Sequence, residues 1–197
     1  MDSVNSKVIK FFINNNIIKE EDKELYEYAL SITVSALIHI ITIVVLGITF
    51  GLVAESIIFY VCFIAIRKFA GGYHAKTAGR CYISSVVLSV LFLIVLKILI
   101  NNINNVIIIA IFVITLFSVG CIYIFAPLDT ENNPLTNKEK SIYGKIARII
   151  ALFMFLLFLI FAFFNLHNIA LPLSFGIFMS ALVLLLRKIQ IIFTENK

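Results

Sequence analysis

The sequence predicts an all-α, polytopic integral membrane protein with about six transmembrane helices and an N-terminal amphipathic helix at the membrane surface. The first observation behind this prediction is composition, since hydrophobic residues make up 61% of the 197 residues, charged residues only 14%, and mean hydropathy is +1.07. A soluble domain usually carries about 25% charged residues. A soluble fold of this size could not bury so much apolar surface, whereas lipid solvates it.

The second observation is a series of six apolar segments, most of which approach the roughly 20 residues that a hydrocarbon core requires. They cover residues 29–50, 52–66, 82–100, 106–126, 146–164 and 169–186. The second segment is short and contains Glu55, so both a tilted span and a re-entrant segment are open for it.

The third observation is the distribution of positive charge. If the N-terminus lies inside and all six segments cross, the inner regions and their margins hold fifteen of the sixteen Lys and Arg residues. Only Lys97 lies near the outer face, where it can snorkel. This asymmetry follows the positive-inside rule and predicts a multi-pass protein of the cell membrane with both termini in the cytoplasm.

The chain lacks a long internal repeat and a Pro/Gly-rich linker, so a single membrane domain is expected over residues 1–197. Its expected parts are an interfacial or cytosolic stretch (1–28), a first hairpin (29–66), an inner loop (67–81), a second hairpin (82–126), a second inner loop (127–145), and a third hairpin with tail (146–197).

The stretch before the first apolar segment shows helical periodicity. Val4, Val8 and Phe11 recur at helical spacing, and Lys7 and Lys10 lie between them. This pattern favours a short amphipathic helix on the membrane surface, with a plain cytosolic lead-in as the alternative.

The first inner loop contains a cysteine suited to nucleophilic chemistry. Cys81 is predicted in the first turn of the third span, with Thr77 as its N-cap and Arg80 beside it. The positive end of the helix dipole and neighbouring cations favour the thiolate, which is the nucleophilic form of cysteine. The alternative is a small apolar residue that fills space at a helix start.

His74 is the candidate base for Cys81 in the same loop. Seven residues of continuous helix would separate the two backbones by about 10 Å, whereas a hydrogen bond needs roughly 3 Å. The loop must therefore fold back, and Gly71, Gly72 and Gly79 supply the backbone freedom for this. The alternative is a solvated loop histidine.

The other cysteines do not suggest a disulfide framework or a metal site. Three cysteines are an odd number, Cys62 and Cys121 lie in apolar runs, and no Cys/His cluster has zinc-ligand spacing. No metal or cofactor is expected. Because the cations flank apolar runs, we expect them to orient the chain in the membrane rather than to bind nucleic acid.

The second inner loop begins with Pro127, which ends the fourth span. Thr136 and Glu139 have the spacing of a capping box, so a helix is expected to restart there. The loop is either a solvated turn or a docking surface for a charged peptide. The cations that could bind substrate are Lys138, Lys140 and Lys145, with Lys76 of the first loop.

The pattern R-x3-G-G-x-H-A-x5-C from Arg67 to Cys81 resembles the accessory gene regulator protein B (AgrB) family, and so does A-P-x-D at residues 126–129. The length and the placement of the motif before a span also fit, so the resemblance covers nearly the whole chain. It implies that Cys81 is a nucleophile with His74 as its base, and that Arg67 and Gly72 occupy further motif positions. The residues expected to support the pair are Arg67, Gly71, Gly72, Arg80 and Asp129, the last as a candidate third catalytic group.

The resemblance implies a membrane cysteine endopeptidase of quorum sensing. Such an enzyme cleaves the C-terminal tail of an AgrD-like propeptide through an acyl-enzyme thioester, which allows cyclisation to a thiolactone or lactone autoinducing peptide. It also implies a homodimer.

Two other classes of function stay open. One is a peptide transporter or exporter without covalent chemistry, for which His39 and Glu55 within apolar segments are suitable. The other is a structural membrane partner, which would tolerate alanine at both His74 and Cys81. A thiol-reactive probe distinguishes the first of these from the peptidase, because only the peptidase requires a highly reactive Cys81.

Overall fold

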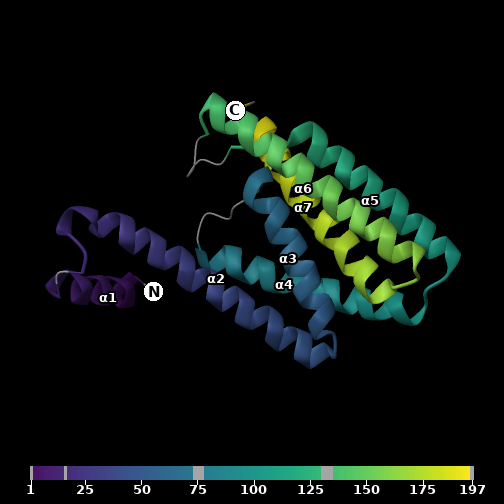
Figure 1. Ribbon diagram of the computed structural model, residues 1–197, viewed down its shortest axis with the longest axis horizontal. Coiled ribbons are helices and arrows are strands. Elements are labelled where there is room, and N and C mark those ends of the chain that lie inside the picture. The colour runs from purple at the N-terminus through teal and green to yellow at the C-terminus, as the bar shows by residue number, and fades with distance from the viewer. Residues whose placement is uncertain (1, 16, 73–77, 130–134, 196–197) are drawn as a thin grey trace. The chain divides into compact units, whose positions relative to one another are not determined.

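The computed structural model describes residues 2–15, 17–72, 78–129 and 135–195. Seven α-helices and one 3-10 turn account for most of these residues (Figure 1). The chain divides into two compact units, Met1–Val45 and Leu46–Lys197, and each unit is treated by itself below. The predicted all-α fold class is confirmed.

The first unit contains α1 (Asp2–Asn14), the 3-10 turn (Glu20–Asp22) and most of α2 (Lys23–Phe50). The helix expected from the periodicity of the first residues is therefore present as α1, and its position on the membrane surface remains a prediction. At the end of α1 the Asn15 side chain donates to the Phe11 carbonyl, 2.8 Å away. The same carbonyl accepts the Asn15 backbone amide at 3.2 Å, so one residue donates twice to the last turn of the helix.

Within the described ranges, five helices are long and apolar enough to cross a membrane, as judged by length and composition. They are α2, α4 (Ala78–Asn101), α5 (Asn105–Phe125), α6 (Asn137–Phe163) and α7 (His167–Glu195). The chain is therefore a multi-pass membrane protein. The remaining predicted segment is α3 (Val53–Ala70), whose 18 residues include Glu55, Arg67 and Lys68. A sixth crossing by α3 remains a prediction.

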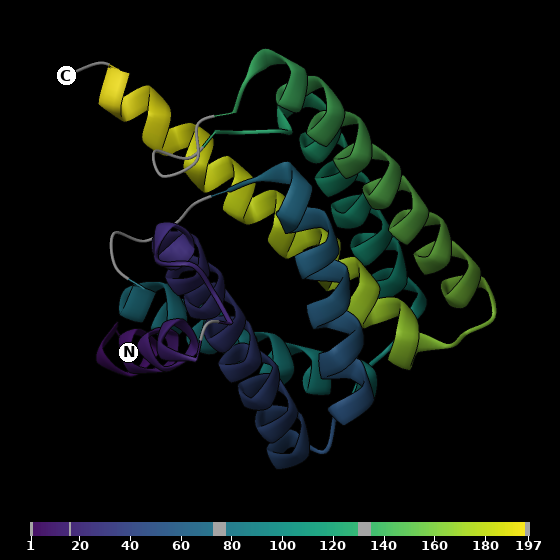
Figure 2. The same ribbon diagram turned by 60° about the vertical axis from the view of Figure 1, so that its left-hand side comes forward.

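The central helix of the second unit is α7, which packs against α3, α5 and α6 (Figures 1 and 2). Small residues allow α3 to approach it closely, since a Cβ added at Gly176 would lie 2.8 Å from the sulfur of Cys62. The Cys62 thiol is buried and donates to the Leu173 carbonyl at 3.5 Å. Cys62 is thus a packing residue between two helices.

Aromatic rings join α4 to this bundle. The Phe92 ring of α4 stacks on Phe59 of α3, with centroids 3.9 Å apart, and lies 5.2 Å from the ring of Phe175 in α7. Near the C-terminus of α4, the Lys97 ammonium donates to the carbonyl of Phe50, the last residue of α2, at 3.2 Å. A cation that caps the C-terminus of a helix is favourable, which accounts for the one lysine predicted near the outer face.

Candidate functional site

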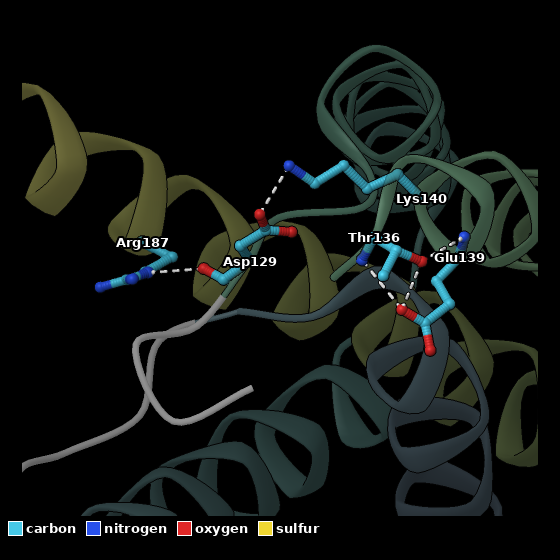
Figure 3. A network of polar contacts seen from close by, with 5 residues as sticks. All are labelled: Asp129, Thr136, Glu139, Lys140 and Arg187. Atoms are coloured by element: carbon cyan, nitrogen blue, oxygen red, sulfur yellow. Dashed lines mark hydrogen bonds and ion pairs between the residues drawn. The ribbon is translucent and has the colours of Figure 1, made fainter. Parts of the chain in front are cut away.

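Hydrogen bonds and an ion pair bring together the C-terminal ends of α3 and α5, the first turns of α6 and the C-terminal part of α7 (Figures 2 and 3). The described parts of the two predicted inner loops, 67–81 and 127–145, therefore meet in space. The sequence predicts that both loops lie on one side of the membrane. Their direct pairing is additional information from the structure.

The contact between the loops is a short backbone pairing at the first of two consecutive glycines. Gly71 and Leu128 form an isolated parallel β-bridge, and the Leu128 amide donates to the Ala70 carbonyl at 3.1 Å. Gly71 has φ +75° and Gly72 has φ +139°, which are conformations that residues with a Cβ rarely adopt. These two glycines therefore turn the chain out of α3 and dock it on the second loop.

Steric contacts also require glycine at both positions. A Cβ added at Gly71 would collide with the Leu128 carbonyl oxygen, and one added at Gly72 would lie 2.9 Å from Cγ1 of Val183 in α7. Gly79 differs from this pair, because it lies inside α4 with open space where a Cβ would be added. Of the three glycines expected to give the loop its backbone freedom, Gly71 and Gly72 adopt conformations that favour glycine, and Gly79 is helical.

The predicted catalytic pair is only partly described. His74, Lys76 and Thr77 lie outside the described residues, as does the Cys81 side chain, so the contact between Cys81 and His74 remains a prediction. The Cys81 backbone belongs to the first turn of α4, which begins at Ala78. That placement matches the sequence prediction and puts the residue at the positive end of the helix dipole.

The two arginines expected to support the pair both belong to described helices. The Arg67 guanidinium lies in the last turn of α3, with its carbon 5.5 Å from the centroid of the Phe63 ring. This is within the distance of a cation–π contact. Arg80 lies in the first turn of α4, close in sequence to Cys81.

Asp129 links two helices at the site (Figure 3). Its Oδ2 atom lies 2.6 Å from the Lys140 ammonium, and its backbone carbonyl accepts a hydrogen bond of 3.0 Å from Nε of Arg187. Its Oδ1 atom is buried and accepts no hydrogen bond from the residues that the structure describes. One carboxylate oxygen is therefore available to accept a further donor.

The lysines predicted to bind substrate differ in their surroundings. Lys140 forms the ion pair with Asp129, so a substrate carboxylate would compete with Asp129 for it. Lys138 and Lys145 are exposed on the same N-terminal part of α6. Their role in binding remains a prediction.

Arg187 is a site residue that the sequence analysis did not single out. It is only 8% exposed, and it donates from Nε to the Asp129 carbonyl and from Nη1 to Oε1 of Gln190 at 2.9 Å. After an apolar span, an arginine is expected simply to orient the helix. The sequence feature that could have identified Arg187 is periodicity, because Arg187 continues the buried face of Ser180 and Val183 at helical spacing.

The capping box predicted at the start of the fifth span is confirmed. The Thr136 amide and hydroxyl both donate to Oε2 of Glu139, at 2.8 and 2.7 Å, and the Glu139 amide donates back to the hydroxyl at 3.4 Å. Hydrogen bonds from Thr136 lower the pKa of Glu139. This cap explains why α6 begins at Asn137, well before the apolar part of the segment.

Replacing Thr136 by alanine is expected to weaken the first turn of α6 by about 1 kcal/mol, because an N-cap hydroxyl is lost. Amide hydrogen exchange in that turn should accelerate about fivefold, since opening costs less by that amount. The control is Ser141→Ala, which removes an exposed hydroxyl from inside the same helix. Equal exchange in both variants would contradict a capping role.

Comparison with known proteins identifies the family. The accessory gene regulator B (AgrB) family matches residues 5–186. The chain is 31% identical to AgrB-like protein 2 of Clostridium perfringens strain 13, over 69% of this chain and 65% of that protein. It is 25% identical to an AgrB-like protein of C. perfringens strain SM101, over 90% of this chain and 85% of that protein.

A third relative is protein FsrB of Enterococcus faecalis, which is 30% identical over 81% of this chain and 63% of its own length. The chain thus spans slightly less than two thirds of two of these three relatives. No solved structure matches it. Because the family match extends over nearly all of the sequence, the chain belongs to the accessory gene regulator B family.

Proposed function

We propose that this protein is a membrane cysteine endopeptidase that cleaves the C-terminal tail from an AgrD-like propeptide. Membership of the AgrB family supports a role in processing quorum-sensing autoinducer peptides. The observation that carries the proposal is the bridge between Gly71 and Leu128. It joins the two segments that hold the motif residues, Arg67 to Cys81 and residues 126–129.

In the first step, the Cys81 thiolate attacks the carbonyl carbon of the peptide bond that joins the propeptide core to its tail. A carbon–sulfur bond forms and the carbon–nitrogen bond breaks. The imidazolium of His74, which took the thiol proton, gives that proton to the departing amine. The core is then a thioester on Cys81, and the tail leaves as a free peptide.

In the second step, a cysteine thiol or serine hydroxyl inside the core attacks the thioester. A ring closes as a thiolactone or lactone, and the Cys81 sulfur is released with its proton returned through His74. Exchange between a thioester and a thiol is nearly balanced in energy, whereas hydrolysis is strongly downhill. Excluding water at the loop therefore decides between ring and linear product.

Charges and the membrane assist this chemistry. The dipole of α4, with Arg80 in its first turn, favours the thiolate of Cys81. Asp129 supports the pair as a carboxylate held near the bridge, with one oxygen that accepts no hydrogen bond within the described part of the chain. The positive-inside rule predicts that the loops lie at the cytoplasmic membrane face. A propeptide held on that face would meet the site at a raised effective concentration.

The cations and a second subunit complete the proposal. Exposed Lys138 and Lys145, with Lys76 and Lys140, offer positive charge to an acidic propeptide tail. The enzyme is expected to act as a homodimer in the bilayer.

The test is direct detection of the thioester. A variant with Cys62→Ala and Cys121→Ala keeps Cys81 as its single thiol. Membranes containing this variant are mixed with a synthetic AgrD-like propeptide that has an acidic tail, and for this experiment its internal cysteine is replaced by alanine so that ring closure cannot consume the thioester. The mixture is then denatured and analysed by mass spectrometry. We expect the core mass on Cys81, and neutral hydroxylamine should release it. His74→Ala should give no adduct.

The same experiment separates the alternatives. A peptide exporter without covalent chemistry would move the propeptide and leave no adduct. If the core becomes attached to Cys81 equally well in His74→Ala, His74 is not the base of the reaction.

A further inference from the structure

Arg187 lies where α7 meets the two docked segments (Figure 3). A cation that is 8% exposed is costly unless its donors are satisfied. Here Nε donates to the Asp129 carbonyl at 3.0 Å and Nη1 to Gln190 at 2.9 Å. The guanidinium is therefore held in one arrangement. It binds the backbone at Asp129, the residue that directly follows Leu128 of the bridge.

One face of α7 supports both sides of that bridge. Gly72 lies against Val183, which is four residues before Arg187 and hence on the same face of the helix. Arg187 holds Asp129 on the opposite segment. The two segments are tied to each other by the hydrogen bond from Leu128 to Ala70. Moving the Asp129 carbonyl would therefore move the glycine turn with it.

The ion pair of Asp129 with Lys140 is a weaker constraint. Its two side chains are 43% and 32% exposed, on Lys140 and Asp129 respectively, and ion pairs so exposed to solvent contribute little. The hydrogen bond from Arg187 is part-buried and charge-assisted, and its donor residue is only 8% exposed, which makes it the stronger of the two contacts. The backbone of the second loop is thus fixed chiefly from α7.

We propose that Arg187 is a positioning residue of the endopeptidase. By holding the Asp129 carbonyl it fixes the Gly71–Leu128 bridge, and with it the point from which the chain runs from Gly72 toward His74. This inference rests on the proposed function, and Arg187 itself touches no reacting atom.

The test uses the full chain in proteoliposomes, with the synthetic propeptide as substrate and iodoacetamide as a probe of Cys81. Arg187→Gln is expected to lower kcat about 100-fold, because small misplacements of a catalytic group cost that much. KM should stay within about twofold, since the substrate-binding cations are untouched. The pH midpoint of Cys81 alkylation should rise, because the imidazole no longer meets the thiol.

The matched control is Lys188→Gln, which removes the same charge from the neighbouring position of α7, about 100° away around the helix. It should keep the parent kcat and alkylation midpoint. Arg187→Lys retains a cationic donor but lacks the planar guanidinium that donates to the Asp129 carbonyl and to Gln190 at the same time. Its kcat should therefore fall about tenfold. If Arg187→Gln does not accumulate in membranes, Arg187→Lys decides the question by the same two measurements.

Parent values of kcat and of the alkylation midpoint in the Arg187 variants would overturn the proposal, and so would an equal loss in Lys188→Gln. A change confined to KM would also overturn it, because that outcome describes a binding residue. The proposed function fails by a different result, namely full propeptide cleavage by Cys81→Ala.

Discussion

Replacing Cys81 by alanine is expected to lower the rate of propeptide cleavage at least about 1,000-fold, because no other group can form the acyl-enzyme. Cys81 lies in the first turn of α4, where the helix dipole favours a thiolate. A serine at this position carries a far weaker nucleophile, so Cys81→Ser should lose cleavage as well. The measurement is the initial rate of tail release in membranes, normalised to the amount of folded protein.

The two other cysteines provide the controls for this prediction. Cys62 and Cys121 are both buried in helices of the second unit, so neither thiol is open to substrate. Cys62→Ala loses the hydrogen bond to Leu173, which should lower thermal stability but leave cleavage by the folded protein close to the parent rate. Cleavage that survives in Cys81→Ala, or disappears only in the other two variants, would contradict the mechanism.

Much of the fold is predictable from the sequence because its main determinant is local. Each apolar run that lipid must solvate becomes a helix, since only a helix satisfies its backbone within one segment. Helix ends are less predictable, because polar residues extend a helix until a cap stops it. Thus α6 begins at Asn137 through the cap at Thr136, and α7 continues to Glu195 past the apolar run.

The site is less predictable because it is built from contacts distant in sequence. The motif from Arg67 to Cys81 identifies the first loop, and the φ values of Gly71 and Gly72 are of the kind that a glycine pair suggests. No local pattern reveals that Leu128 would pair with Gly71 or that Arg187 would hold Asp129. These contacts depend on how α7 packs between its neighbours, which a single sequence does not encode in any short window.

Replacing Gly71 by alanine is expected to have the second large effect. A Cβ at φ +75° is strained by about 1–3 kcal/mol. The same Cβ would also meet the Leu128 carbonyl oxygen, so the bridge cannot persist. We expect kcat for the propeptide to fall at least about 100-fold, because the chain would no longer leave α3 in the direction that the reaction needs.

Gly51→Ala separates these two causes. Gly51 has nearly the same φ, +72°, but nothing lies within 4 Å of an added Cβ, so this variant carries only the conformational strain. It should lower the melting temperature and preserve kcat, whereas Gly71→Ala should lower both. If Gly51→Ala reduces kcat as much as Gly71→Ala does, the loss follows from general destabilisation. If Gly71→Ala keeps the parent kcat, docking of the glycine turn on Leu128 is not needed for catalysis, since the collision would have displaced it.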